Sequence, residues 1–120
     1  MKISEQLLQC AAEVRRGWCQ CALEDESGGV CAHGAIHRVV AGKAKISLTQ
    51  ELHYNKMPLV EYLWKALGHC RIASWNNAPD QTQENVAATF ELAAILAEQD
   101  EARIGVSETK ANLAEVMLHD

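Results

Sequence analysis

The chain has 120 residues, a formal net charge of -5 and 48% hydrophobic residues. This length suffices for one domain with one core, and the acidic charge argues against direct nucleic-acid binding, which uses a surplus of Lys and Arg. No stretch approaches the roughly 20 apolar residues that cross a bilayer, and no signal peptide is evident. We therefore expect a cytoplasmic protein without membrane contact, whose five cysteines are free thiols.

The first half of the chain predicts helices separated by a polar turn. Apolar residues recur at helical spacing over residues 3–14, with Ser4 as the expected N-cap. Residues 18–33 include a polar, glycine-rich stretch and permit a small hairpin. A second helix is expected to begin at residue 31 or 32 and to end at Gly42.

The middle of the chain carries two further helix signals. Ser47 and Gln50 have the spacing of a capping box, which predicts a short helix after Ser47. Pro58 is typical of the first turn of a helix, and Gly68 is its expected end. Trp64 lies on the apolar stripe of this helix and is expected in the core.

The longest helix is expected from a cap at Asp80 or Thr82 to about residue 99. Its wide apolar arc, residues 86–97, can be covered within one chain or can form the seam of a homodimer. A last helix over residues 107–118 is expected to bring three side chains to the core: Leu113, Val116 and Met117. Together these elements predict an all-α or mainly α fold, a compact bundle of about five helices in a single domain over residues 1–120.

Three segments occur in an order that resembles a known family. They read Gly17-Trp18-x-Gln20-x-Ala22-Leu23, then Gly29-x-Cys31-Ala-x-Gly34-Ala35-Ile36, then Trp75-Asn76-Asn77-Ala78-Pro79-x-x-Thr82. This order resembles the family called domain of unknown function 6197, whose members occur in bacteria and their phages, and the resemblance covers residues 14 to about 98. The family's turn usually reads Trp-Asn-Asp-Ala-Pro-Gly-Arg-Thr and its position 21 is usually glycine, so this chain departs from the pattern at four positions: Cys21, Asn77, Asp80 and Gln81. The resemblance implies no activity, since the family has no assigned chemistry.

Cys31 is the first candidate for chemistry. A thiol at a helix N-terminus has its thiolate favoured by unpaired N–H groups, and a histidine can serve as its base. His33 and His37 are near in sequence, and His69 or His53 can approach from a distance. The alternative is a packed structural thiol, because cysteine is among the most commonly buried residues.

A zinc site is the second candidate. If the hairpin forms, Cys19, Cys21, Cys31 and His33, or His37 in place of His33, can present four tetrahedral ligands. Against this, structural zinc sites usually place two or more residues between paired cysteines. Unrelated thiols are therefore the simpler expectation.

The turn that begins with Trp75, Asn76 and Asn77 is the third candidate. Its indole and amides, with Asp80 and with Trp18 and Gln20 of the earlier motif, can hold an anionic or nucleotide-like ligand. The alternative is structural, because Asx residues commonly bond the backbone of their own turn while a tryptophan fills the core.

These patterns favour binding over catalysis. We expect a non-enzymatic, protein-binding accessory module without a cofactor, whose acidic surface suits a basic partner protein. The family resemblance implies a phage or mobile-element association and a bacterial target, such as a component of a defence system. A small cysteine-dependent enzyme using Cys31 and a small zinc module are the alternatives.

Overall fold

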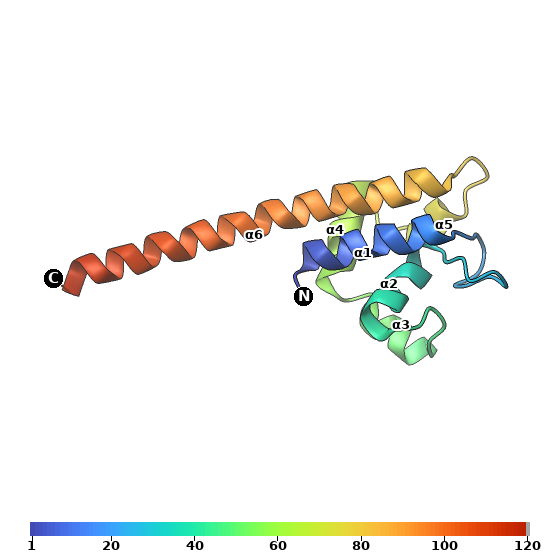
Figure 1. The fold of residues 1–120 in the computed structure, drawn as a ribbon, viewed down its shortest axis with the longest axis horizontal. Helices are drawn as coiled ribbons and strands as arrows, with labels where there is room; N and C mark the ends of the chain where they lie inside the picture. Colours follow the sequence, from blue (N-terminus) through green and yellow to red (C-terminus); the bar gives the residue numbers. More distant parts are fainter. Residues whose placement is uncertain (120) are drawn as a thin grey trace.

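The computed structural model describes the backbone of residues 1–119 and the side chains of residues 1–103. Over this backbone the chain forms six helices and no β-strand, which confirms a mainly α fold (Figure 1). The helices are α1 (Ile3–Arg16), α2 (Ala32–Ala41), α3 (Leu48–Tyr54), α4 (Pro58–Leu67), α5 (Ile72–Asn76) and α6 (Gln83–His119). None of the described helices is long and apolar enough to cross a membrane.

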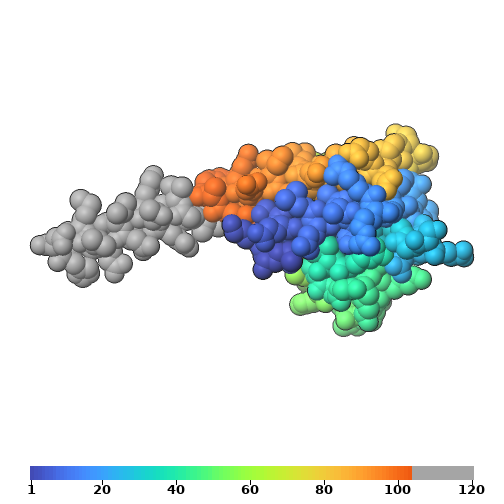
Figure 2. All heavy atoms as spheres, in the orientation of Figure 1, coloured from blue at the N-terminus to red at the C-terminus, as the bar shows by residue number. Residues whose placement is uncertain are grey.

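The first and last helices pack side by side and antiparallel, as Figures 1 and 2 both show. Leu7 and Val14 of α1 and Phe90 of α6 are fully buried, and burial of each such side chain stabilises the fold by about 1.5–3 kcal/mol. Alanines on the buried face of α6 let the neighbouring helices approach closely: Ala87, Ala93, Ala94 and Ala97. We call this α1–α6 contact the helical seam.

Polar contacts close the helical seam at both of its ends. At one end the Ser4 hydroxyl donates to the Glu101 carboxylate, with an Oγ–Oε2 distance of 2.7 Å. At the other end the Arg15 guanidinium pairs with Glu84 at 2.6 Å and with Glu91 at 2.8 Å. The two helices are thereby fixed in register.

Helix α4 contacts α6, and α2 packs against α1. Three side chains of α4 enter the core: Leu59, Val60 and Leu63. The Tyr62 hydroxyl of α4 donates to Asp100 of α6 at 2.6 Å. Trp64 is half-buried and packs against the core, as its place on the stripe predicts.

Several predicted helix ends are confirmed. Helices α2 and α4 end at Gly42 and Gly68, whose φ angles of 81° and 82° are left-handed conformations that favour glycine. The Ser47 side chain accepts the Gln50 N–H at the start of α3, as the capping box predicts. Of the two proposed caps for the longest helix, Thr82 is the one formed, since its Oγ1 accepts the Asn85 N–H.

Two local predictions are wrong, and a third is realised only in part. Helix α1 begins at Ile3, so Ser4 lies inside its first turn and bonds Glu101 instead of capping the helix. The small hairpin that residues 18–33 permit is reduced to one antiparallel bridge between Glu24 and Val30, without strands, because Val30 also pairs in parallel with Trp18.

The second wrong prediction concerns the last helix. The chain does not break between residues 99 and 107, and α6 runs unbroken to His119. One glycine inside a helix costs only about 1 kcal/mol, so Gly105 does not end it. The predicted core side chains Leu113, Val116 and Met117 lie outside the described side chains. Most of the apolar arc of residues 86–97 is covered within the chain, while Leu92 and Ile95 stay exposed.

Candidate functional site

A buried asparagine connects three segments of the chain. Asn76 ends α5 and is 1% exposed. Its Oδ1 accepts from Trp18 Nε1 at 2.9 Å and from the Ala32 N–H at 3.0 Å. Its Nδ2 donates to the Cys19 carbonyl at 3.1 Å and to Asn77 Oδ1 at 3.0 Å. All four hydrogen-bonding positions of this amide are therefore used.

Two further amides extend this network. Gln20 Nε2 donates to the carbonyls of Asn76 and Ala78, at 3.1 and 2.9 Å. Asn77 Oδ1 accepts the Cys21 N–H at 2.8 Å. We call Trp18, Gln20, Asn76 and Asn77 the polar clasp, because together they fasten the loop after α1 to α5.

The residues of the third candidate do not all lie together. The structure brings together Trp18, Gln20, Asn76 and Asn77, which bond across 56 to 58 residues more than within their own turn. Trp75 is half-buried against the core, and Asp80 is exposed and makes no side-chain hydrogen bond within the described part of the chain. The saturated amide of Asn76 has nothing left to offer a ligand.

Helix α2 meets the loop at a point where only glycine fits. A Cβ on Gly34 would lie 2.0 Å from the Leu23 carbonyl oxygen, so the backbones touch here. The Cys31 N–H donates to that same carbonyl at 3.3 Å. Cys21 has a φ of 63°, a left-handed conformation in which glycine would be unstrained. These contacts fix residues 21–23 over the beginning of α2.

The loop, α2, α3 and α5 line an open pocket of about 280 Å³. Cys31 and His33 line it from the start of α2, Glu51 from α3, and Asn77 from the end of the turn after α5. Its apolar walls come from Ala22, Leu23 and Ala73, and Cys21 lies at its rim. The polar clasp fixes the wall that residues 21–23 form, whereas Glu51 comes from α3, none of whose residues is buried.

One acid in the pocket lacks an internal partner. Among the described residues, no side chain bonds or pairs with the Glu51 carboxylate. Desolvation is the main cause of the pKa shifts of Cys31 and His33, and the nearby Glu51 carboxylate adds a smaller upward contribution to each. Asn77 Oδ1 is occupied, while its Nδ2 has no acceptor within the described residues.

Burial decides the protonation of the two other titratable groups. Desolvation, with the neighbouring His37 as a smaller cause, lowers the pKa of His33, so its ring is neutral at pH 7. Desolvation also raises the pKa of the Cys31 thiol, although N–H groups of Gly34 and His33 oppose this. Cys31 is 8% exposed, and its sulfur accepts the Gly34 N–H at 3.3 Å. Its proton is therefore retained at neutral pH.

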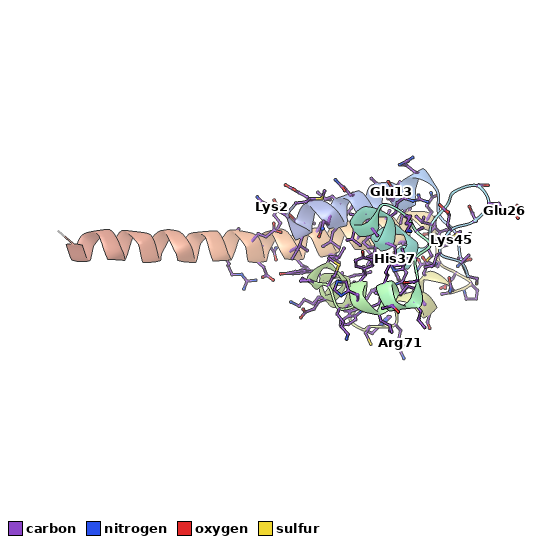
Figure 3. All side chains as sticks on the ribbon, turned by 90° about the horizontal axis from the view of Figure 1, so that it is seen from below. Lys2, Glu13, Glu26, His37, Lys45 and Arg71 are labelled. Carbon is purple, nitrogen blue, oxygen red and sulfur yellow. The ribbon has the colours of Figure 1, made fainter. Side chains whose placement is uncertain are left out.

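The predicted catalytic residues are only partly brought together. Cys31 and His33 share the pocket, but no hydrogen bond joins them. His37 is buried, with its Nδ1 3.0 Å from the Ala44 carbonyl and its Nε2 without a partner among the described residues (Figure 3). His69 accepts the Arg71 N–H and His53 is exposed, and neither lines the pocket.

The proposed zinc ligands do not form a metal site. Within residues 1–103 no three His, Cys, Asp or Glu side chains gather in a geometry that holds a metal ion. Cys19 donates its thiol proton to the Ala22 carbonyl at 3.3 Å, and Cys21 points from a separate, exposed position. Cys21, Cys31 and His33 line one pocket, but among the described residues no three of the proposed ligands are arranged to hold a metal ion.

Glu51 was missed by sequence reasoning. It follows the capping box of α3 by one residue. An acidic residue in the first turn of a helix complements the helix dipole, so it needs no functional explanation and does not stand out in the sequence. No local signal connects it to Cys31 or Asn77, which lie 20 and 26 residues away in the sequence. Only the docking of α3 beside α2 brings them together.

Comparison with known proteins gives a family and no activity. No similar protein was found among curated proteins, and no similar chain among solved structures. Residues 2–96 match the model described as "Family of unknown function (DUF6197)", and this range contains the whole of the polar clasp and every residue of the pocket. The chain therefore belongs to this family of unknown function.

Proposed function

We propose that the protein is a non-enzymatic binding module whose pocket receives one side chain of a partner protein. The observation that carries this proposal is the pocket itself, in which walls fastened by the polar clasp surround the unpaired carboxylate of Glu51. Concave sites with a small number of polar groups that lack internal partners are typical of specific binding. A volume of about 280 Å³ suits a single side chain more than a large cofactor.

The state of the pocket's thiol and imidazole supports binding over catalysis. A cysteine nucleophile needs a lowered pKa or a hydrogen-bonded base, and burial raises the pKa of Cys31. His33 is neutral, yet it makes no hydrogen bond to the sulfur. Under this proposal Cys31 and His33 form part of the pocket wall and take part in no reaction.

The biological setting of this binding is proposed from the family resemblance alone. We propose a phage- or mobile-element-associated accessory protein that acts in the cytoplasm on a bacterial protein, such as a defence component. The net charge of -5 supports a partner with a basic surface, because complementary charge speeds encounter and suppresses wrong partners.

Site-specific photo-crosslinking tests the proposal. A photoreactive amino acid is placed at Ala73 in the pocket or at Ala88, an exposed position of α6 that serves as the matched control. In cells of the native host we expect Ala73 to crosslink to one protein, and an Ala73→Trp variant that fills the pocket to lose this partner in affinity purification. Equal crosslinking from both positions, or capture unaffected by Ala73→Trp, would contradict the proposal.

A cysteine-dependent enzyme is the second candidate, and one observation favours it. Cys31, His33 and Glu51 line the same pocket, with the first N–H groups of α2 at the sulfur. Alkylation with iodoacetamide at pH 7.5, followed by peptide mass spectrometry, separates the candidates. The binding proposal expects the exposed Cys21 and Cys70 to react well before Cys31, whereas a Cys31 that reacts first would favour the enzyme.

A further inference from the structure

We infer that the group received by the pocket is cationic, a lysine or arginine side chain of the partner, and that Glu51 is its anchor. This inference rests on the proposed binding function and names the chemistry of the occupant. It begins with the side chains that line the pocket: among the described residues Glu51 is the one acid there, and no Lys or Arg lines it. Burial also lowers the pKa of His33, so the lining is acidic.

Glu51 differs from the other acids by its place in the pocket, since some of them are ion-paired and others, such as Glu26 and Asp80, are exposed. Arg38 pairs with both Glu13 and Glu24, while Arg15 pairs with two acids of α6. The described arginines at positions 16 and 103 likewise pair with acids near them in sequence. The Glu51 carboxylate has no such cation, although it lies in a cavity where a paired charge is stabilised more than on the open surface.

An anionic ligand is disfavoured because the helix terminus that would bind it is already occupied. Helix N-termini attract anions through N–H groups that lack intrahelical partners. At α2 the Ala32 N–H donates to Asn76 Oδ1 and the Gly34 N–H donates to the Cys31 sulfur. The protein's own side chains thus satisfy these donors, and an acid faces the space in front of them.

The rest of the lining matches an alkyl chain that ends in a charge. Ala22, Leu23 and Ala73 offer an apolar wall for the methylene groups of lysine or arginine. The neutral imidazole of His33 can accept a hydrogen bond from an ammonium or guanidinium group beside Glu51. An acceptor of the ligand's main chain can reach the remaining donor, Asn77 Nδ2.

NMR titration of the full chain tests the inference with isosteric probes. N-acetyl-arginine amide carries the charge, N-acetyl-citrulline amide has almost the same shape without it, and N-acetyl-glutamate amide carries the opposite charge. We expect the arginine probe to shift the resonances of His33, Glu51 and Asn77 with millimolar affinity, and the citrulline probe to bind about tenfold more weakly or less, since a hydrogen bond to a charged group is lost.

Two variants with the same change in net charge complete the experiment. Glu51→Gln removes the anchor, while Glu26→Gln removes an exposed charge at the tip of the loop before α2 (Figure 3). Affinity for the arginine probe should fall about tenfold or more in Glu51→Gln and stay within about twofold in Glu26→Gln. Binding unchanged in Glu51→Gln would overturn the inference.

The probes also separate this inference from the proposed function. If citrulline or glutamate amide shifts the pocket residues as strongly as arginine amide does, the pocket binds but its occupant is not cationic, and only the inference fails. If no probe shifts any pocket residue and crosslinking from Ala73 also finds no partner, the binding function itself fails. A free amine such as agmatine that binds far more tightly than the arginine amide would contradict a protein side chain as the source.

Discussion

The helical seam and the polar clasp hold the molecule together by different means. In the seam, apolar side chains such as Leu7 and Phe90 are buried along the whole contact of α1 with α6. Their contribution is non-directional and roughly proportional to buried area, so each residue supplies its own share. In the clasp, four directional bonds converge on the amide of Asn76. Stability is spread over many residues in one region and concentrated in one residue in the other.

This difference has a bearing on the pocket. Among the described residues, none that lines the pocket belongs to α1 or α6, whereas the clasp fixes the loop that forms one wall of the pocket. Substitutions in the seam should therefore lower stability and leave the shape of the pocket unchanged. Substitutions in the clasp should affect both.

The largest expected effect comes from Asn76→Leu, a change that keeps the size of the side chain and removes its polar atoms. It leaves the Trp18 indole N–H, the Ala32 N–H and the Cys19 carbonyl buried without partners. Since each orphaned group costs about 1–3 kcal/mol, the free energy of unfolding should fall by about 3 kcal/mol or more in urea titrations.

The matched change in the helical seam is Leu7→Met, which also conserves volume. It should cost less than about 1.5 kcal/mol, because a flexible apolar side chain can refill the same space. Equal losses in the two variants would break the comparison, since they would mean that the clasp tolerates shape-conserving changes as well as the seam does.

Gly34→Ala should have an intermediate effect. The added Cβ would lie 2.0 Å from the Leu23 carbonyl oxygen, so the loop must move, at a cost of about 1–3 kcal/mol. We expect the NMR resonances of Cys21 and Asn77 to shift as the pocket wall moves. Gly42→Ala is the control, because its left-handed φ also costs about 1–2 kcal/mol while no atom lies within 4 Å. Pocket resonances that shift in Gly42→Ala but not in Gly34→Ala would contradict this account.

The smallest effect is expected for Tyr62→Phe, which removes a single bond beside the helical seam. The hydrogen bond to Asp100 raises the pKa of Tyr62 to about 12 and lowers the pKa of Asp100. The loss should be about 1 kcal/mol at pH 7, measured by urea unfolding.

The pH dependence of that loss follows from both pKa shifts. The raised pKa of Tyr62 makes its contribution complete below about pH 10 and lost as the pH rises towards 12. The lowered pKa of Asp100 makes its contribution complete above its ordinary pKa and lost as the pH falls below it. The difference between wild type and Tyr62→Phe should therefore be greatest between about pH 5 and 9. A difference that stays constant from pH 3 to 11 would show that the bond does not form in solution.

Local signals in the sequence were enough for most helix ends. Proline at the start of α4, glycine after α2 and α4, and the Ser47 capping box all act within a few residues, so their effect can be deduced without the fold. Ser4 was misassigned because its partner, Glu101, lies 97 residues away. A serine near a helix start looks the same whether it caps that helix or bonds a distant acid.

The candidate site was predictable only as a set of unusual residues. The motif order singled out Trp18, Gln20, Asn76 and Asn77, and the structure brings them together. Their partners could not be predicted, because an asparagine after a tryptophan serves equally well in a local turn. The pocket and the role of Glu51 depend on how α3 docks, which no periodic pattern encodes.

The pairing of α1 with α6 also constrains the order of events during synthesis. The apolar face of α1 emerges from the ribosome first, yet the residue that bonds Ser4 follows 97 positions later. At about 5–20 residues per second, translation takes roughly 5–20 s to supply that partner. Until then α6 cannot cover Leu7 and Val14, so the nascent chain exposes an apolar helix face that favours aggregation. Slow translation of residues 83–103 should therefore increase the dependence of this protein on chaperones.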